Sequence, residues 1–120
     1  MEHKFDNNIP IYLQIVDIIK LDIISGKIRP GEKLHSVRIY ANMLQVNPNT
    51  MQKALMELED LKLIYTERTN GKYVTNDTDL IEKYKIKLAN KIINKYFKDM
   101  ELIGIEKNKA IKYIEKDGKI

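Results

Sequence analysis

The sequence predicts a mainly α-helical fold with one small β-hairpin, arranged as a winged helix-turn-helix and followed by a short helical tail. Three segments in which apolar residues recur at helical spacing come first. A short β-prone run follows, and Asn70-Gly71 after it is a typical hairpin turn. A long apolar stripe of helical period then begins at Ile81. This order predicts a winged domain over residues 1–75 and a helical dimerisation tail over residues 76–120.

The first helix is expected from about residue 10 to residue 25. Proline is favoured in the first turn of a helix and glycine just past its end, which fits Pro10 and Gly26. After a turn at residues 29–32, residues 33–34 are too short for more than a small edge strand. The expected apolar face of this helix is made of isoleucines: Ile11, Ile15, Ile18, Ile19 and Ile23.

Two further helices are expected on either side of a tight connector at residues 45–46. Ser36 can cap a helix over residues 37–44, because its hydroxyl can accept a hydrogen bond from a backbone N–H of the first turn. Asn47-Pro48 is the clearest helix start in the chain, since Asn is a favoured N-cap and Pro fits the first helical position. The buried face of this third helix should consist of Met51, Ala54, Leu55, Leu58 and Leu61.

The hairpin and the tail complete the predicted elements. Residues 63–68 are β-prone and residues 72–75 form the return strand, with Asn70 and Gly71 both expected to tolerate positive φ. Thr78 or Asp79 can cap a long helix that ends near Ile103, and a last short helix is expected over residues 107–116. The stripe of the long helix consists of Ile81, Tyr84, Leu88, Ile92, Tyr96 and Met100.

This stripe either packs within the chain or pairs with a second chain. A homodimer is the expected arrangement, because a helix this apolar needs partners on more than one side. Only about 45 residues follow the wing, and this length is too short for a separate ligand-binding domain with its own core. An unknown small-molecule effector would therefore bind at the dimer interface or between the tail and the winged domain.

Composition excludes several classes of protein. No apolar run approaches the roughly 20 residues of a membrane span, and the absence of cysteine excludes disulfides and thiolate metal sites. His3 and His35 do not stand at metal-ligand spacing. The chain also has no glycine-rich phosphate loop and no Ser/His/Asp arrangement in a plausible context. We expect a cytoplasmic protein that is not an enzyme and needs no metal or cofactor.

The placement of charge on the third helix points to a polyanion. A helix N-terminus favours acidic residues, yet residues 47–55 contain no acid and one base, Lys53. The acids Glu57, Glu59 and Asp60 all fall near the negative end. The preceding helix repeats the pattern, with Arg38 in its first turn. Two successive helix N-termini of this kind could both face phosphates.

The side chains at the start of the third helix are suited to reading DNA bases. Asn and Gln can bind adenine through two hydrogen bonds, Lys can bind guanine or phosphate, and Thr can contact a thymine methyl. Ordinary polar surface is the alternative for each residue taken singly. Arg38 and Lys72 would anchor phosphates. The complete candidate DNA-binding set is Ser36, Arg38, Asn47, Asn49, Thr50, Gln52, Lys53, Arg68, Gly71 and Lys72.

Residues 9–75 resemble the DNA-binding domain of the GntR family of bacterial regulators. The similarity is carried, in order along the chain, by Pro10-Ile11-Tyr12-Leu13-Gln14-Ile15, Ser25-Gly26-Lys27-Ile28-Arg29-Pro30-Gly31-Glu32-Lys33-Leu34, Ser36-Val37-Arg38, Val46-Asn47-Pro48-Asn49-Thr50-Met51, Ala54-Leu55-Met56-Glu57-Leu58 and Gly71-Lys72-Tyr73-Val74. The Asn-Pro-Asn-Thr stretch and the small C-terminal part are similar to its YtrA subfamily. The resemblance implies DNA contacts by Arg38, the start of the third helix and the Gly71 wing, dimerisation through the C-terminal helices, and control of a transporter operon.

Four residues depart from the family pattern. His35 stands where the family usually has proline, Tyr40 where leucine is common, and Thr69 in place of the first wing glycine. Pro48 stands where many relatives have arginine, although the YtrA subfamily commonly has proline. These differences affect the path of the wing and one base contact rather than the fold.

Two functions of different class remain open from the sequence. The first is a sequence-specific transcription regulator, expected to be a repressor, that binds a pseudo-palindromic operator in double-stranded DNA as a homodimer. The alternative is a protein-interaction module that uses the winged fold without DNA. The absence of acid in the first turns of the third helix favours the first.

Overall fold

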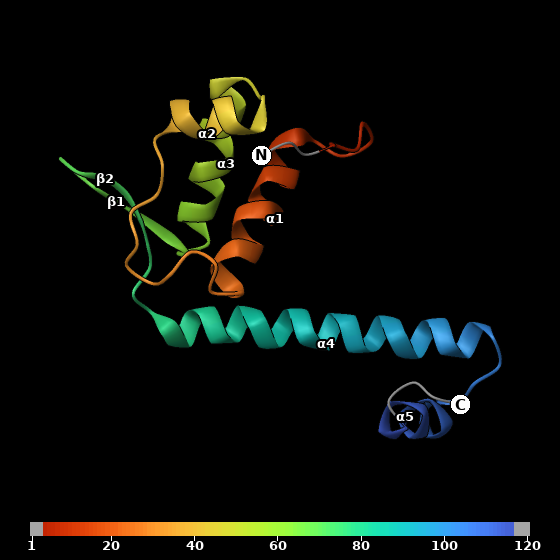
Figure 1. Ribbon diagram of the computed structural model, residues 1–120. Coiled ribbons are helices and arrows are strands. Elements are labelled where there is room, and N and C mark those ends of the chain that lie inside the picture. The colour runs from red at the N-terminus through yellow and green to blue at the C-terminus, as the bar shows by residue number, and fades with distance from the viewer. Residues whose placement is uncertain (1–3, 117–120) are drawn as a thin grey trace. The chain divides into compact units, whose positions relative to one another are not determined.

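A computed structural model describes residues 4–116 and confirms the mainly α-helical fold with one hairpin (Figure 1). The chain forms two compact units, the first ending at Lys83 and the second beginning at Tyr84. The elements are α1 (Ile11–Ile24), α2 (Val37–Leu44), α3 (Pro48–Asp60), β1 (Ile64–Glu67), β2 (Gly71–Val74), α4 (Thr78–Leu102) and α5 (Lys107–Glu115).

The core of the first unit is built around α3. Helices α1 and α2 and strand β1 all contact this helix. Met51, Leu55 and Leu58 are fully buried along it, as the periodicity predicted, whereas Leu61 is only half-buried at the C-terminal cap. On α1 the predicted face is confirmed at Ile15, Ile19 and Ile23, whereas Ile18 is half-buried and Ile11, at the first position of the helix, remains 44% exposed.

Side-chain caps start the two helices of the helix-turn-helix as predicted. The Ser36 hydroxyl accepts a hydrogen bond from the N–H of Ile39 at 3.2 Å. The Asn47 side chain accepts from the N–H of Asn49 at 2.7 Å, with proline next to it in the first turn. The prediction for α4 was wrong by one residue, because the carboxylate that accepts from its first turn belongs to Asp77, which precedes the helix.

Helices α2 and α3 end in the same way, without glycine. Gln45 follows α2 at φ 56° and Lys62 follows α3 at φ 65°, both in the left-handed region. After α3 the N–H of Lys62 donates to the carbonyl of Glu59 at 2.9 Å, and the N–H of Leu63 donates to the carbonyl of Leu58 at 3.1 Å. These two bonds are the Schellman arrangement, which normally uses glycine at the left-handed position.

The hairpin turns through three residues, 68–70, rather than two. Glu67 pairs with Gly71 and Thr66 with Lys72, so the strands join through a loop that contains Asn70. Positive φ is found at Gly71 (106°) but not at Asn70, although both residue types tolerate it. A three-residue loop needs only one residue in that region, which explains the difference.

The other edge of β2 pairs with the segment before α2. The N–H of Leu34 donates to the carbonyl of Lys72 at 2.8 Å, and the N–H of Gly31 donates to that of Val74 at 3.0 Å. A bridge between Lys33 and Tyr73 confirms the small edge strand. The wing is thus held on both sides of β2.

The second unit contains most of α4 together with α5. The Tyr96 hydroxyl donates to the carbonyl of Ala110 at 2.7 Å, and Ala110 is fully buried. Ile92 is 62% exposed and Leu102 84% exposed. Ile81, at the start of the predicted stripe, is buried and belongs to the first unit.

Candidate nucleic-acid interface

The start of α3 presents polar side chains to solvent without any acid. Asn49, Gln52 and Lys53 are exposed and Thr50 is half-buried. The first turns of α2 and α3 contain no acidic residue. Because each helix carries a partial positive charge at its N-terminus, the N-termini of α2 and α3 both favour an anion.

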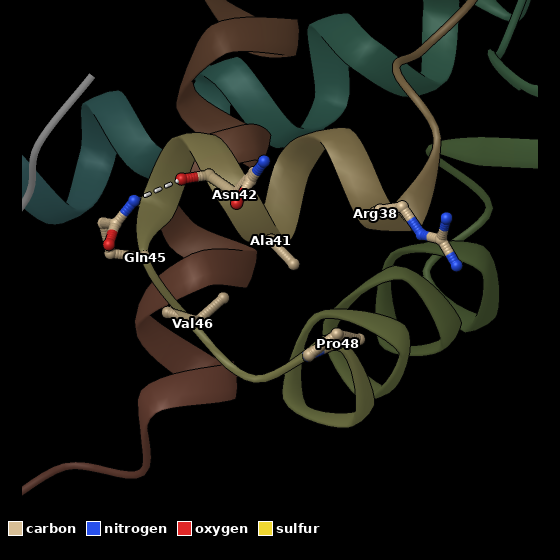
Figure 2. A pocket seen from close by; sticks show the side chains of 6 residues that line it. All are labelled: Arg38, Ala41, Asn42, Gln45, Val46 and Pro48. Atoms are coloured by element: carbon tan, nitrogen blue, oxygen red, sulfur yellow. Dashed lines mark hydrogen bonds between the residues drawn. The ribbon is translucent and has the colours of Figure 1, made fainter.

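A polar hollow lies between α2 and the start of α3 (Figure 2). It has a volume of about 390 Å³, and its lining includes Arg38, Asn42, Gln45 and Pro48. Arg38 and Asn42 are four residues apart and so lie on one side of α2. Arg38 takes part in no ion pair among the residues that the structure describes, which leaves its guanidinium available to an incoming anion.

Asn42 and Gln45 were not among the residues predicted from the sequence. The Gln45 amide donates to the backbone carbonyl of Asn42 at 2.9 Å, which Figure 2 shows as a dashed line. Helical spacing from Arg38 would have indicated Asn42. Gln45 lines the hollow because the chain turns through the left-handed region there, which its spacing from Arg38 does not reveal.

Lys53 lies against α1 rather than extending freely from α3. Its ammonium nitrogen is 4.1 Å from the centre of the Tyr12 ring. A cation over an aromatic face at an exposed site is stabilised by about 0.5–1 kcal/mol. A stronger contact to a base or phosphate is therefore able to displace it.

The two basic side chains of the wing have different environments. Arg68 lies in the exposed turn and is not in an ion pair within residues 4–116. Lys72 is only 18% exposed, and its ammonium lies 3.2 Å from the carboxylate of Glu59 and 2.9 Å from the hydroxyl of Thr66. The structure thus gives Lys72 an internal partner that the sequence did not indicate.

The predicted residues fall in two places on the first unit. Arg38 lines the same hollow as Pro48 at the start of α3, and the predicted base readers Asn49, Gln52 and Lys53 follow Pro48 in the first turns of that helix without lining the hollow. The wing is joined to the other end of α3, where Glu59 contacts both strands. A polyanion would have to be long enough to touch both places.

Metal-binding clusters, membrane-spanning helices and the histidines are the remaining features to locate in the structure. Residues 4–116 contain no group of three or more side chains suited to a metal ion, and no helix among them is long and apolar enough to cross a membrane. The His35 ring packs edge-on against Tyr40, with centroids 5.1 Å apart, and burial raises the pKa of Tyr40. His3 lies outside the described residues.

Comparison with known proteins agrees with this geometry. Residues 11–74 match the model of the bacterial regulatory proteins of the gntR family. The chain is 33% identical over 115 residues to the uncharacterized HTH-type transcriptional regulator YhcF of Bacillus subtilis, covering 96% of this chain and 95% of that protein. It is 35% identical over 108 residues to the HTH-type transcriptional repressor YtrA of Bacillus subtilis, covering 88% and 82%.

Solved structures show the same similarity. A GntR family transcriptional regulator from Listeria monocytogenes has a TM-score of 0.83 at 42% identity, over 93% of this chain and 98% of that one. AraR(DBD) in complex with operator ORR3 has a TM-score of 0.54 at 27% identity, over 62% of this chain and 88% of that one. The match over more than half of the chain, with the winged fold and its anion-facing helix starts, shows that this chain belongs to the GntR family of DNA-binding bacterial transcription regulators, with relatives of the YtrA type.

Proposed function

We propose that this regulator binds a specific operator as a homodimer and acts as a cytoplasmic repressor. One observation carries the proposal: two capped, acid-free helix starts border a polar hollow in which Arg38 has no acidic partner among the described residues. In this arrangement Arg38 and the α2 N-terminus bind a backbone phosphate. The start of α3 then enters the major groove.

The base contacts follow from the exposed side chains of α3. Asn49 and Gln52 carry amides that match the two hydrogen-bonding groups of adenine, and the Thr50 methyl matches that of thymine. Lys53 binds guanine or phosphate after leaving Tyr12. Arg68 and the backbone at Gly71 contact the phosphates beside the groove.

The contribution of Arg38 is tested by replacing it. We expect Arg38→Ala to weaken operator binding by about 1–3 kcal/mol and to reduce the salt dependence by about one phosphate contact. Arg29→Ala is the matched control, because it removes the same charge from the turn beyond the C-terminal end of α1. Equal affinity of the Arg38 and Arg29 variants at moderate salt would exclude Arg38 as an anchor.

The function as a whole is tested by selecting bound fragments from genomic DNA with the purified protein and sequencing them. A few enriched sites that share an inverted repeat would support specific binding by a dimer. A reporter placed behind such a site should fall in activity when the protein is expressed. Folded protein that enriches no fragment at low salt would favour the protein-interaction alternative or a regulator that first needs an effector.

Dimerisation is proposed to use the second unit. Ile92 (62% exposed), Leu102 (84%) and Ile103 (71%) offer apolar surface that no described residue covers well, and such exposure is typical of an interface. Tyr84, Leu88 and Met100 are half-buried along the same helix and extend this surface. Tyr96 already bonds to α5, so part of the predicted stripe is used within the chain.

Substitution of Ile92 separates assembly from folding. Because Ile92 is largely exposed in one chain, Ile92→Asp should leave the monomer folded while sedimentation reports a shift from dimer to monomer. Met56→Asp is the control, since Met56 is 55% exposed on α3 and outside the proposed interface. A dimer that persists in the Ile92 variant would place the interface elsewhere.

A further inference from the structure

A polar cluster joins the wing to the end of α3. The hydroxyl of Thr66 on β1 donates to the carboxylate of Glu59. The ammonium of Lys72 on β2 lies 3.2 Å from that carboxylate and 2.9 Å from the Thr66 hydroxyl. Thr66 and Lys72 are directly paired across the hairpin, so their side chains lie on one face of the sheet and Glu59 meets both.

The position of the cluster gives it influence over the tip of the wing. The pair Thr66–Lys72 is followed by Glu67–Gly71, the last pair before the turn that carries Arg68. A two-stranded hairpin with strands of four residues is at best marginally stable alone. Of the side-chain hydrogen bonds that the structure describes between α3 and the hairpin, those of the cluster lie one residue pair from the turn.

The cluster also makes the positive charge of Lys72 unavailable for a contact with DNA. Lys72 is 18% exposed and its partner carboxylate neutralises it, whereas Arg68 lies in the open turn. The contacts hold the carboxyl of Glu59 in its charged form: the Thr66 hydrogen bond foremost, and then the bond from Lys72, lower the pKa of Glu59. An acid near the negative end of α3 is unfavourable by itself, so its partners on the hairpin offset that effect.

We propose that Glu59 is a positioning residue that, with Thr66 and Lys72, locks the wing to the recognition helix. The inference rests on the DNA-binding function proposed above and reassigns Lys72 from phosphate anchor to structural partner. When the lock holds, Arg68 approaches the phosphates in a fixed relation to the bases read by α3. When it is broken, the wing moves and part of the ordering must be supplied on binding.

The test compares two neighbouring acids of α3, Glu59 and Asp60. Removal of any acid near a polyanion should strengthen binding through charge alone. The lock predicts the opposite for one of them: Glu59→Ala weakens binding to the duplex most enriched from genomic DNA by roughly threefold to tenfold. Asp60→Ala, which removes an exposed acid outside the cluster, leaves affinity unchanged or slightly raised. Equal increases for both variants would overturn the proposal.

A second variant distinguishes the two roles of Lys72. Lys72→Met keeps the apolar stem but removes the cation, so a positioning role predicts weaker binding with an unchanged salt slope. A phosphate contact predicts a slope reduced by about 0.9 in log–log units. A reduced slope would therefore refute the reassignment.

Hydrogen exchange in the free protein gives a readout that does not depend on DNA. Glu59→Ala and Lys72→Met should both accelerate exchange at the backbone amides of Tyr65 and Tyr73, which face each other across the hairpin next to the cluster, by severalfold, with little change in the middle of α3. Unchanged exchange would overturn the lock even if affinity fell. Accelerated exchange in both variants, together with a wild-type protein that binds no DNA, would instead leave the lock standing and refute the proposed function.

Discussion

Replacement of Lys62 by glycine should stabilise this protein. Lys62 occupies the left-handed position of a Schellman cap at φ 65°, and its exposed side chain makes no hydrogen bond or ion pair within residues 4–116. A residue with a Cβ loses about 1–2 kcal/mol in that conformation. Glycine loses about 0.5–1 kcal/mol more backbone entropy on folding than alanine does. The difference predicts that Lys62→Gly exceeds Lys62→Ala in stability by about 0.5–1 kcal/mol.

The comparison between glycine and alanine isolates the backbone effect, because both variants lack the lysine charge and stem. Urea unfolding followed by circular dichroism gives the two free energies of unfolding, and a difference of about 1 kcal/mol corresponds to a shift in Tm of about 4–8 °C for a unit of this size. Asp17, exposed in the middle of α1, provides the control. There glycine should be less stable than alanine by about 1 kcal/mol.

The sign of the stability difference between Lys62→Gly and Lys62→Ala tests whether the backbone at residue 62 is strained. A Lys62→Gly protein that is no more stable than Lys62→Ala would show that the left-handed backbone at this position is not strained. Operator affinity should be the same in the two variants, because the cap lies at the end of α3 away from the proposed base contacts.

Three further outcomes follow from the same structure. Gln45→Gly should gain less than Lys62→Gly, about 0–0.5 kcal/mol in urea unfolding, because it relieves the left-handed backbone but loses the amide bond to the carbonyl of Asn42. Gly31→Ala should destabilise the protein by about 1 kcal/mol, mainly because φ is 77°; the Asn76 side-chain oxygen, 2.6 Å from the new Cβ, ends an exposed side chain that can rotate away. An alanine variant as stable as the wild type would contradict this. The pKa of Glu59 is lower in the folded protein than in the unfolded chain, so its charged form stabilises the fold at pH values above the ordinary glutamate pKa, and this stabilisation is lost as pH falls through the folded-state pKa. The difference in unfolding free energy between wild type and Glu59→Ala should therefore narrow in acid and stay constant from neutral pH upward.

The sequence by itself determined the elements and their order. Apolar spacing along α3 predicted Met51, Leu55 and Leu58 as core, because a buried face must repeat with the helical period. Ser36 and Asn47 were predicted as caps because the hydrogen bond of an N-cap joins residues two or three apart in the chain. The acid-free helix starts were likewise visible, since helix polarity is a local property.

Only the tertiary structure decided which of the basic side chains are free. Lys53, Lys72 and Arg68 are alike in the sequence, yet one lies over Tyr12, one is held by Glu59 and one is exposed. The partners of Lys53 and Lys72 lie on other elements, and Glu59 is 13 residues from Lys72 in the chain. No periodicity in the sequence encodes such a pairing. The left-handed turns at residues 45 and 62 were also missed, because neither residue is a glycine and the need for the turn arises from packing the next element. Local spacing therefore fixes helices, caps and dipoles, while contacts between elements decide where each charge is available.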